Sequence, residues 1–285
     1  MFFFQARPGA CMPGFCFFSE VDMAARPQVT DIHSRDNAFV KELRRLSQDS
    51  TAYRKQGQVW LEGDHLCRAA LVRDLKPKVA VFAQSFWPQA PEEWVQAASK
   101  VVVLADALFD EISSLESPAR MGYVMDWDAA LQAQSGIATV VLDRVQDAGN
   151  VGSILRSASA FGFTQIVALK GTAALWSQKV LRAGMGAHFG LHLVEAASVE
   201  DVKALQVPLV VTSSHQGTLI HEADLPWPCA WAMGHEGQGV GEALMEMAQR
   251  RISIAQPGGE ESLNVAAAAA ICLHASSVSM LRRRG

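Results

Sequence analysis

Three short polar segments stand out in the C-terminal half of the chain because their residue types and spacing suit chemistry. They are Asp147-Ala-Gly-Asn150-Val-Gly-Ser-Ile-Leu-Arg156, Gly234-His-Glu236-Gly-Gln-Gly239 and Glu261-Ser262-Leu-Asn264-Val-Ala-Ala. Each follows a strand-like run, and the first and third lead into a helical pattern. Loops after the carboxyl ends of parallel strands carry the binding and catalytic groups of α/β proteins. We therefore expect the three segments to form one site.

The first segment predicts a helix N-terminus followed by an anion-binding arginine. Asn150 has a side chain preferred at the N-cap, and Gly149 and Gly152 permit a tight turn and a close approach. Arg156 lies at least one turn into the helix. It is either a solvent-facing arginine or a side chain that reaches back over the loop to a phosphate, which its planar fork of donors suits.

The second segment brings three glycines close together, but not in the order of a dinucleotide fingerprint, and no P-loop lysine follows. The backbone amides of Met233 and Gly234, at the end of a strand, are positioned to face a flat ligand. Glu236 is either a solvated loop carboxylate or a functional group of the site.

The third segment opens an alanine-rich helix. We expect Ser262 to be the N-cap and Asn264 to lie in the first turn, where asparagine lowers helix propensity. That local penalty indicates a functional reason for Asn264. The free amides and positive dipole end of such a helix also suit an anion.

The hydrophobic pattern predicts two α/β domains. Residues 30–115 form a small domain, with helices over 37–47 and 65–75 and strands at 58–61, 79–82 and 101–104. Residues 116–135 lack a clear pattern and are assigned to a linker. In residues 136–285, apolar strands (138–142, 165–169, 209–212, 229–233 and 251–254) alternate with helices (151–161, 176–184 and 263–276). Continuous apolar strands between helices indicate a parallel sheet covered on both faces.

Composition sets further bounds. The chain has 285 residues, of which 49% are hydrophobic and 19% charged, so it can bury a large core. Its net charge of −4 argues against wholesale wrapping of nucleic acid but leaves room for a local basic patch. The five scattered cysteines are read as buried or free thiols of a reducing cytosol. Residues 1–29 are interpreted as a disordered extension, with Met23 an alternative initiator, and nothing there indicates a membrane.

Taken together, the three polar segments resemble the motifs of the SpoU RNA 2′-O-ribose methyltransferases, in order and in spacing. The N-terminal half is similar to that family's ribosomal-protein-like substrate-binding domain, through Ser34-Arg-Asp-Asn37, Lys41, Arg54 and Leu61-Glu-Gly63. The resemblance covers roughly residues 30–280. In one departure, Ala255 and Gln256 precede Pro257, where the family usually has proline earlier after the last strand.

The resemblance implies a trefoil-knotted domain that dimerises, binds S-adenosylmethionine and transfers its methyl group to a ribose 2′-hydroxyl without a metal. Arg156, Asn150, Glu236, Ser262 and Asn264 would be the catalytic residues. Arg156 would act on the 2′-hydroxyl, as a base or as a phosphate clamp. The expected cofactor-binding residues are Thr212, Met233, Gly234, Ile254 and Leu263.

RNA is the expected partner, ribosomal more than transfer RNA, in the cytoplasm. A basic cluster in the N-terminal half is either a solvated helix face or the RNA-binding surface: Arg35, Lys41, Arg44, Arg45, Arg54 and Lys55. The sequence disfavours two other classes of protein. A nucleotide-binding oxidoreductase needs an early glycine fingerprint that this chain lacks. A non-catalytic RNA-binding protein of the same fold is disfavoured by the presence of Arg156, Asn150 and Asn264.

Overall fold

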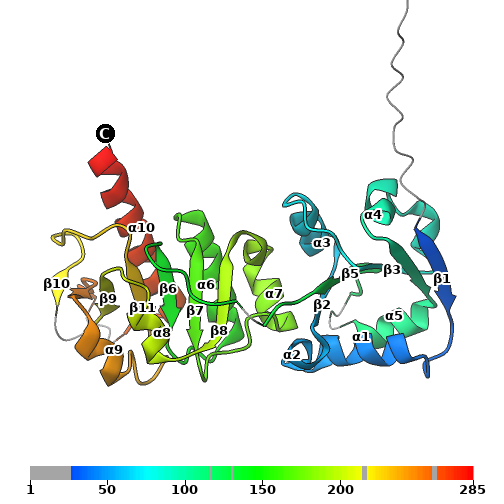
Figure 1. Ribbon diagram of the computed structural model, residues 1–285, viewed down its shortest axis with the longest axis horizontal. Helices are drawn as coiled ribbons and strands as arrows, with labels where there is room; N and C mark the ends of the chain where they lie inside the picture. The colour runs from blue at the N-terminus through cyan, green and yellow to red at the C-terminus, as the bar shows by residue number, and fades with distance from the viewer. Residues whose placement is uncertain are drawn as a thin grey trace, which may run out of the picture.

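The computed structural model describes residues 27–113, 115, 117–129, 131–213, 217–258 and 262–284. Two α/β domains lie side by side along the long axis of the molecule (Figure 1). Most of the predicted extension, residues 1–26, lies outside the described residues. Its last two residues do not belong to an extension, because the first strand begins at Gln28.

The N-terminal domain contains a mixed five-stranded sheet in the order β1-β4-β3-β5-β2. Its elements are β1 (Gln28–Ile32), α1 (Ala38–Gln48), α2 (Ala52–Gln56), β2 (Gln58–Glu62), α3 (Asp64–Leu71), β3 (Val79–Ala83), η1 (Trp87–Gln89), α4 (Glu92–Gln96), β4 (Lys100–Leu104), α5 (Asp106–Ile112) and β5 (Met121–Asp126). Helix α1 buries Val40, Leu43 and Leu46 and leaves its cationic face outward, as its spacing predicts.

Strand β5 corrects the predicted linker, because residues 121–126 pair antiparallel with both β2 and β3 inside the sheet. Gly122 made this segment look irregular in the sequence. In the structure a Cβ at Gly122 would lie 2.2 Å from the Trp60 ring, so the glycine makes room for a buried tryptophan. The connection between the domains therefore begins after Asp126.

The C-terminal domain has seven parallel strands in the order β10-β12-β9-β11-β6-β7-β8. The strands are β6 (Thr139–Leu142), β7 (Gln165–Leu169), β8 (His192–Ala197), β9 (Leu209–Thr212), β10 (Thr218–Leu219), β11 (Ala230–Met233) and β12 (Arg250–Ser253). The helices are α6 (Ala148–Ala160), α7 (Gln178–Gly184), η2 (Ala187–Gly190), α8 (Val199–Lys203), α9 (Glu242–Met247) and α10 (Val265–Arg284).

Alternating side chains of the strands build a core on each face of this sheet. Val140 and Ile166 pack in the core that includes residues of α6, α7 and α10. Val141 and Val167 pack on the other face, with residues of α8 and α9. The predicted parallel sheet with two covered faces is confirmed. The trefoil knot stays a prediction.

Helix α10 is longer than predicted. It is the one helix of the described residues with the length and hydropathy of a membrane span, and 22% of that span is buried. It nevertheless forms part of the domain. Ala269, Cys272 and Leu273 are buried in the core, and Trp231 Nε1 donates to Ser276 Oγ at 2.8 Å. Core helices of globular domains meet the same criterion of length and composition.

Candidate active site

The predicted site residues gather at the carboxyl-terminal edge of the seven-stranded sheet. Strands β12, β9, β11 and β6 are consecutive neighbours there. Because they are parallel and in register, Thr212, Met233 and Leu142 end at the same edge. The chain segments that follow β6, β11 and β12 are the three polar segments. The fold thus brings together residues that lie more than 100 positions apart, such as Asn150 and Asn264.

Helix α6 begins earlier than predicted, and Asp147 is its N-cap rather than Asn150. The Asp147 side chain accepts from the backbone N–H of Asn150 at 2.7 Å. An aspartate at this position satisfies a free amide and complements the positive end of the helix dipole. The cap leaves the Asn150 side chain available for contacts with other loops.

Helix α10 begins later than predicted, and Asn264 is its cap rather than Ser262. The Asn264 Oδ1 atom accepts from the backbone N–H groups of Ala266 and Ala267, at 2.9 and 3.2 Å. The expected penalty of an asparagine in the first turn is therefore absent, because Asn264 stands before the helix in a preferred position.

The three segments meet in one directional chain of hydrogen bonds. Asn264 Nδ2 donates to Asn150 Oδ1 at 2.9 Å, and Asn150 Nδ2 donates to Glu236 Oε1 at 3.1 Å. An ionised carboxylate only accepts, so Asn150 must turn its amide nitrogen toward Glu236 and its oxygen toward Asn264. Asn264 can donate there because its own oxygen serves the helix cap. The orientation of each amide is thus fixed by its neighbours.

Glu236 joins the second segment to the N-terminus of α6. Besides Asn150, its carboxylate accepts from the backbone N–H groups of Asp147 at 3.2 Å and Gln146 at 3.4 Å. Desolvation by the neighbouring loops raises the pKa of Glu236, but these bonds and one from its own backbone outweigh that effect and leave the pKa below its ordinary value. Glu236 is therefore a stably ionised anchor between the two loops.

The far end of the second segment is held by residues that the sequence reasoning missed. Asp143 is 4% exposed and accepts from Gly241 N–H at 2.6 Å and from Arg144 Nε at 2.8 Å. Arg144 Nη1 donates in turn to Gln238 Oε1 at 3.1 Å. The loop from Gly234 to Gly241 is thus tied at both ends to the residues that follow β6. The sequence signal that could have identified them is an aspartate followed by an arginine, Asp143 and Arg144, directly after an apolar strand.

Arg156 and Ser262 lie outside this hydrogen-bond network. Both are exposed, and within the described part of the chain their side chains have no hydrogen-bond or ion-pair partner. Arg156 lies six positions after Asn150, which places it about 120° away around the helix. Its stripe, with Gly149 and Ser153, is the solvent-facing side of α6.

The residues expected to bind the cofactor end or follow strands at this edge of the sheet. Gly234 is tightly enclosed, since a Cβ there would lie 2.2 Å from the backbone of Gly239. Leu263 is 39% exposed and offers an apolar surface. Gln256, two residues after the half-buried Ile254, has a buried Oε1 with no hydrogen-bond partner among the described residues. An exposed apolar side chain and an unsatisfied polar atom are both common among the residues that line ligand sites.

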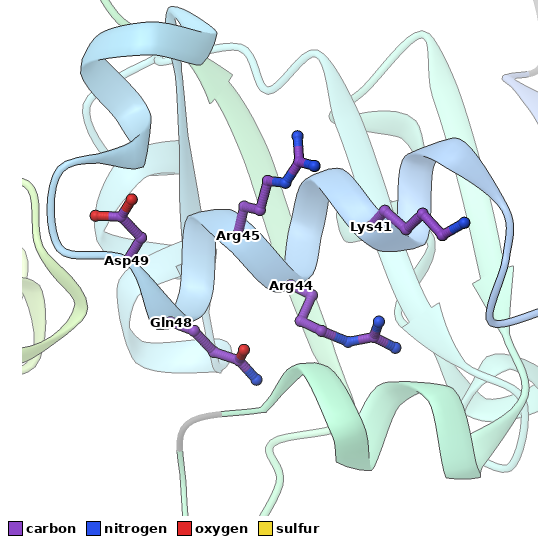
Figure 2. Close-up of a pocket in the computed structure, with 5 residues that line it drawn as sticks. All are labelled: Lys41, Arg44, Arg45, Gln48 and Asp49. Atoms are coloured by element: carbon purple, nitrogen blue, oxygen red, sulfur yellow. The ribbon is translucent and has the colours of Figure 1, made fainter.

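The predicted basic cluster is largely paired with acids. Arg35 and Arg44 both donate to Glu111 of α5, and Lys41 pairs with Asp36. A hollow of about 410 Å³ runs along α1 and is lined by Lys41, Arg44, Arg45, Gln48 and Asp49. Figure 2 shows four of these side chains along α1 and Asp49 just after its end, with Arg44 pointing toward the neighbouring helix.

Arg54 and Lys55 lie on α2, beyond this hollow. Arg54 donates to Glu195 of the C-terminal domain at 2.9 Å. Arg45 and Lys55 are exposed and have no acidic partner among the described residues.

Neither a metal centre nor a disulfide is present in the described residues. No group of three or more His, Cys, Asp or Glu side chains there has the arrangement of a metal site. Cys67, Cys229 and Cys272 are free and buried. Burial raises the pKa of the Cys229 and Cys272 thiols to about 12, so both are unreactive core residues.

Comparison with known proteins gives the same division into two domains. Residues 138–274 match the SpoU rRNA Methylase family, and residues 37–121 match the MRM3-like substrate binding domain. The chain is 29% identical over 247 residues to the 23S rRNA (guanosine(2553)-2'-O)-methyltransferase RlmP of Bacillus subtilis, covering 85% of this chain and 97% of that protein. It is 32% identical over 154 residues to the 23S rRNA (guanosine-2'-O-)-methyltransferase RlmB of Bordetella pertussis, covering 52% of this chain and 63% of that protein.

Solved structures show the same architecture over nearly the whole chain. An AdoMet-bound rRNA methyltransferase from Sinorhizobium meliloti aligns with a TM-score of 0.76 and 27% identity, covering 90% of this chain and 98% of that chain. A putative RNA methyltransferase of the TrmH family from Porphyromonas gingivalis aligns with a TM-score of 0.73 and 28% identity, covering 87% and 99%. The linked motif loops, the parallel sheet and these similarities together establish that residues 138–274 form a domain of the SpoU family of RNA methyltransferases, preceded by an MRM3-like substrate binding domain.

Proposed function

We propose that the protein transfers a methyl group from S-adenosylmethionine to a ribose 2′-hydroxyl of ribosomal RNA. The observation that carries the proposal is the hydrogen-bond chain Asn264–Asn150–Glu236, which joins the three motif loops at one edge of the sheet. Relatives whose names specify 23S rRNA 2'-O-methylation support the reaction and the substrate class. The substrate-binding domain at residues 37–121 supports ribosomal over transfer RNA.

In this proposal the chain's residues act mainly by positioning. S-adenosylmethionine supplies a methyl group already activated by its sulfonium, so no metal is required. Backbone groups at Thr212, Met233 and Gly234 hold the cofactor at the strand ends, and Ile254 and Leu263 flank its flat ring. Asn150, Glu236 and Asn264 fix the loops around the reacting atoms, with Ser262 beside them. Correct placement of two reactants removes much of the entropic part of a barrier.

Arg156 acts as a phosphate clamp. A guanidinium is effectively always protonated and is a poor base. Its position on the exposed stripe of α6 leaves all its donors available to an incoming RNA backbone. A planar bidentate contact to the phosphate beside the target ribose would fix the hydroxyl for in-line attack.

The hollow on α1 is the proposed RNA-binding surface of the N-terminal domain. Lys41, Arg44 and Arg45 line it, and Lys55 follows on α2. Glu111 neutralises Arg35 and Arg44 in the free protein, so RNA phosphates must compete with an exposed carboxylate. Exposed ion pairs are weak, and binding to phosphate releases counterions, so such an exchange is accessible and salt-dependent.

We further propose that the protein is a cytoplasmic homodimer. Helix α10 exposes the apolar residues Ile271 and Leu281, at 40% and 60%. Arg156 also lies outside the network of its own chain. A second copy packed against α10 would cover the apolar surface and complete the site.

The test is a map of ribose 2′-O-methyl groups in RNA from cells with and without the gene. We expect one ribosomal site to disappear on deletion and to return with the wild-type gene, but not with the Arg156→Ala variant. Loss of a transfer RNA site instead would reassign the substrate. An unchanged map, together with no methyl transfer by the purified protein, would refute the enzymatic function.

A further inference from the structure

The contact between the two domains contains a nearly buried carboxylate. The Glu195 side chain on β8 is 10% exposed and accepts hydrogen bonds from three donor groups. The single hydroxyl of Tyr53 donates to this carboxylate, with its Oη 2.7 and 2.8 Å from the two oxygens. Arg54 Nη2 and the Leu175 N–H each donate at 2.9 Å. Tyr53 and Arg54 belong to the N-terminal domain, so one side chain of the methyltransferase domain holds helix α2 of the other.

A bulge in β8 gives Glu195 its position. Val194 pairs with Val167 and Ala197 pairs with Leu169, so Glu195 and Ala196 together stand opposite a single residue of β7. Ala196 has a φ of 54°, a conformation that alanine adopts rarely. Bulges of this kind re-aim a side chain at the edge of a sheet. A strained non-glycine residue beside the key carboxylate indicates that its direction matters.

The rest of the contact is closely packed and apolar. Ala174 and Leu181 are buried in the core of the N-terminal domain, although they follow β7 in the sequence. Gln178 Nε2 donates to the backbone oxygen of Trp60 at 2.8 Å. At Gly186 a Cβ would lie 2.5 Å from the Cβ of Ala69. Domains joined by a solvated contact move independently, whereas a packed apolar contact holds them together.

We propose that Glu195 is a positioning residue that locks the substrate-binding domain onto the methyltransferase domain, so that the RNA is bound by two surfaces at a fixed spacing. The locked helix α2 directly follows α1, which carries the cationic hollow. Fixing α2 therefore fixes the distance from the phosphate-binding side chains to the motif loops. This inference rests on the proposed function for its role in RNA binding, but not for the lock itself.

A fixed distance between the two RNA-binding surfaces favours a folded RNA as the substrate. Two surfaces held at one distance bind a preformed RNA surface as a single bivalent unit, and the second contact is made at high effective concentration. Loss of the Glu195 contacts would let the distance between the two RNA-binding surfaces vary. RNA binding would then weaken, although the residues around the reacting atoms would be unchanged. Affinity for the whole RNA substrate is then lost, while turnover of bound substrate is retained.

The test compares Glu195→Gln and Tyr53→Phe with the wild type, using Glu200→Gln as control, a carboxylate that is 74% exposed and pairs with Lys203 of its own helix. Hydrogen exchange of the free protein is measured over residues 52–57 and 174–181. We expect faster exchange there in both variants but not in the control. Glu195→Gln retains shape and volume, and Tyr53→Phe removes only the hydroxyl, so one folded variant is sufficient.

Steady-state methylation of the RNA substrate supplies the second readout. We expect KM for RNA to rise roughly tenfold in the two variants, with kcat and cofactor affinity within about twofold of wild type. Unchanged exchange with unchanged KM would overturn the proposal. Equal losses of kcat and cofactor affinity would overturn it too, since Glu195 would then support the methyltransferase fold alone. If the wild type methylates no RNA, the proposed function fails, while the exchange data still decide the lock.

Discussion

Replacement of Asn264 by aspartate separates two roles of one side chain. Its Oδ1 caps helix α10, and its Nδ2 donates to Asn150. Aspartate keeps an acceptor for the cap and adds a charge that the helix dipole favours. It removes the donor. Asn150 would then face two groups that only accept, Glu236 and the new carboxylate, and neither orientation of its amide satisfies both.

The magnitudes follow from these contacts. Loss of one hydrogen bond between an exposed and a half-buried side chain costs about 0.5 to 1.5 kcal/mol, which corresponds to a roughly 2- to 10-fold lower rate if the network positions the substrate. Asn264→Ala removes the cap as well. A lost cap costs about 1 kcal/mol, which for a domain of this size lowers Tm by about 2–4 °C. Asn264→Asp keeps the cap, so it should lower Tm less than Asn264→Ala does.

The assay pairs transfer of labelled methyl from S-adenosylmethionine to RNA with thermal unfolding of the same preparations. We expect both variants to lose activity, and we expect Asn264→Asp to keep a higher Tm than Asn264→Ala. Full activity of Asn264→Asp would show that the Asn264–Asn150 bond does not position the substrate. An equal drop in Tm for both variants would show that the cap and the network are not separable.

Three further predictions concern other parts of the site and the core. Arg156→Ala should abolish methyl transfer while equilibrium cofactor binding stays normal; retention of full transfer would refute its assignment. Gly234→Ala should weaken cofactor binding at least roughly tenfold, because the new Cβ meets the backbone of Gly239 at 2.2 Å, whereas Gly237→Ala, whose Cβ would meet nothing closer than 3.8 Å, serves as control. Burial lowers the pKa of His188 from 6.5 to about 4. Between these pH values the unfolded chain binds a proton that the folded chain does not bind. The free energy of unfolding therefore falls as pH drops from 6.5 to 4, by about 3 kcal/mol in all. His188→Gln should flatten that part of the stability curve against pH, measured by urea unfolding; an unchanged curve would refute the assignment.

The strands of the C-terminal domain were predictable because each is a continuous apolar run that the parallel sheet buries on both faces. β7 and β9 have the predicted bounds. β8 was missed, since its sequence includes Glu195 and a bulge, and the contact that explains both lies in the other domain. β5 was missed because Gly122 interrupts the strand pattern, and the reason for this glycine is the space that the Trp60 ring occupies. In both cases a distant partner determined the local structure.

Part of the candidate site was predictable from the sequence, whereas its geometry was not. Polar residues after strand ends identified Asn150, Glu236 and Asn264, which the structure joins directly. Both caps were predicted at the wrong residue. Asp147 and Asn264 each competed with a nearby capping residue, and local preference alone does not rank asparagine, aspartate and serine. At helix α6 a contact between loops decides which residue is the cap: the Asn150 side chain donates to Glu236, and Asp147 caps the helix instead.

The contacts of Glu236 also bear on where the proton of the ribose 2′-hydroxyl goes during methyl transfer. Methyl transfer from a sulfonium to a hydroxyl releases a neutral thioether and one proton. Glu236 is the carboxylate of the network, but its hydrogen bonds stabilise the ionised form and hold its pKa below the ordinary value, which makes it a weaker base. Its oxygens are occupied by donors from two loops. We infer that Glu236 is an anchor and that the proton passes to solvent or to the RNA itself. Catalysis then depends on how firmly the loops place the hydroxyl, and substitutions within the network should affect kcat more than cofactor affinity.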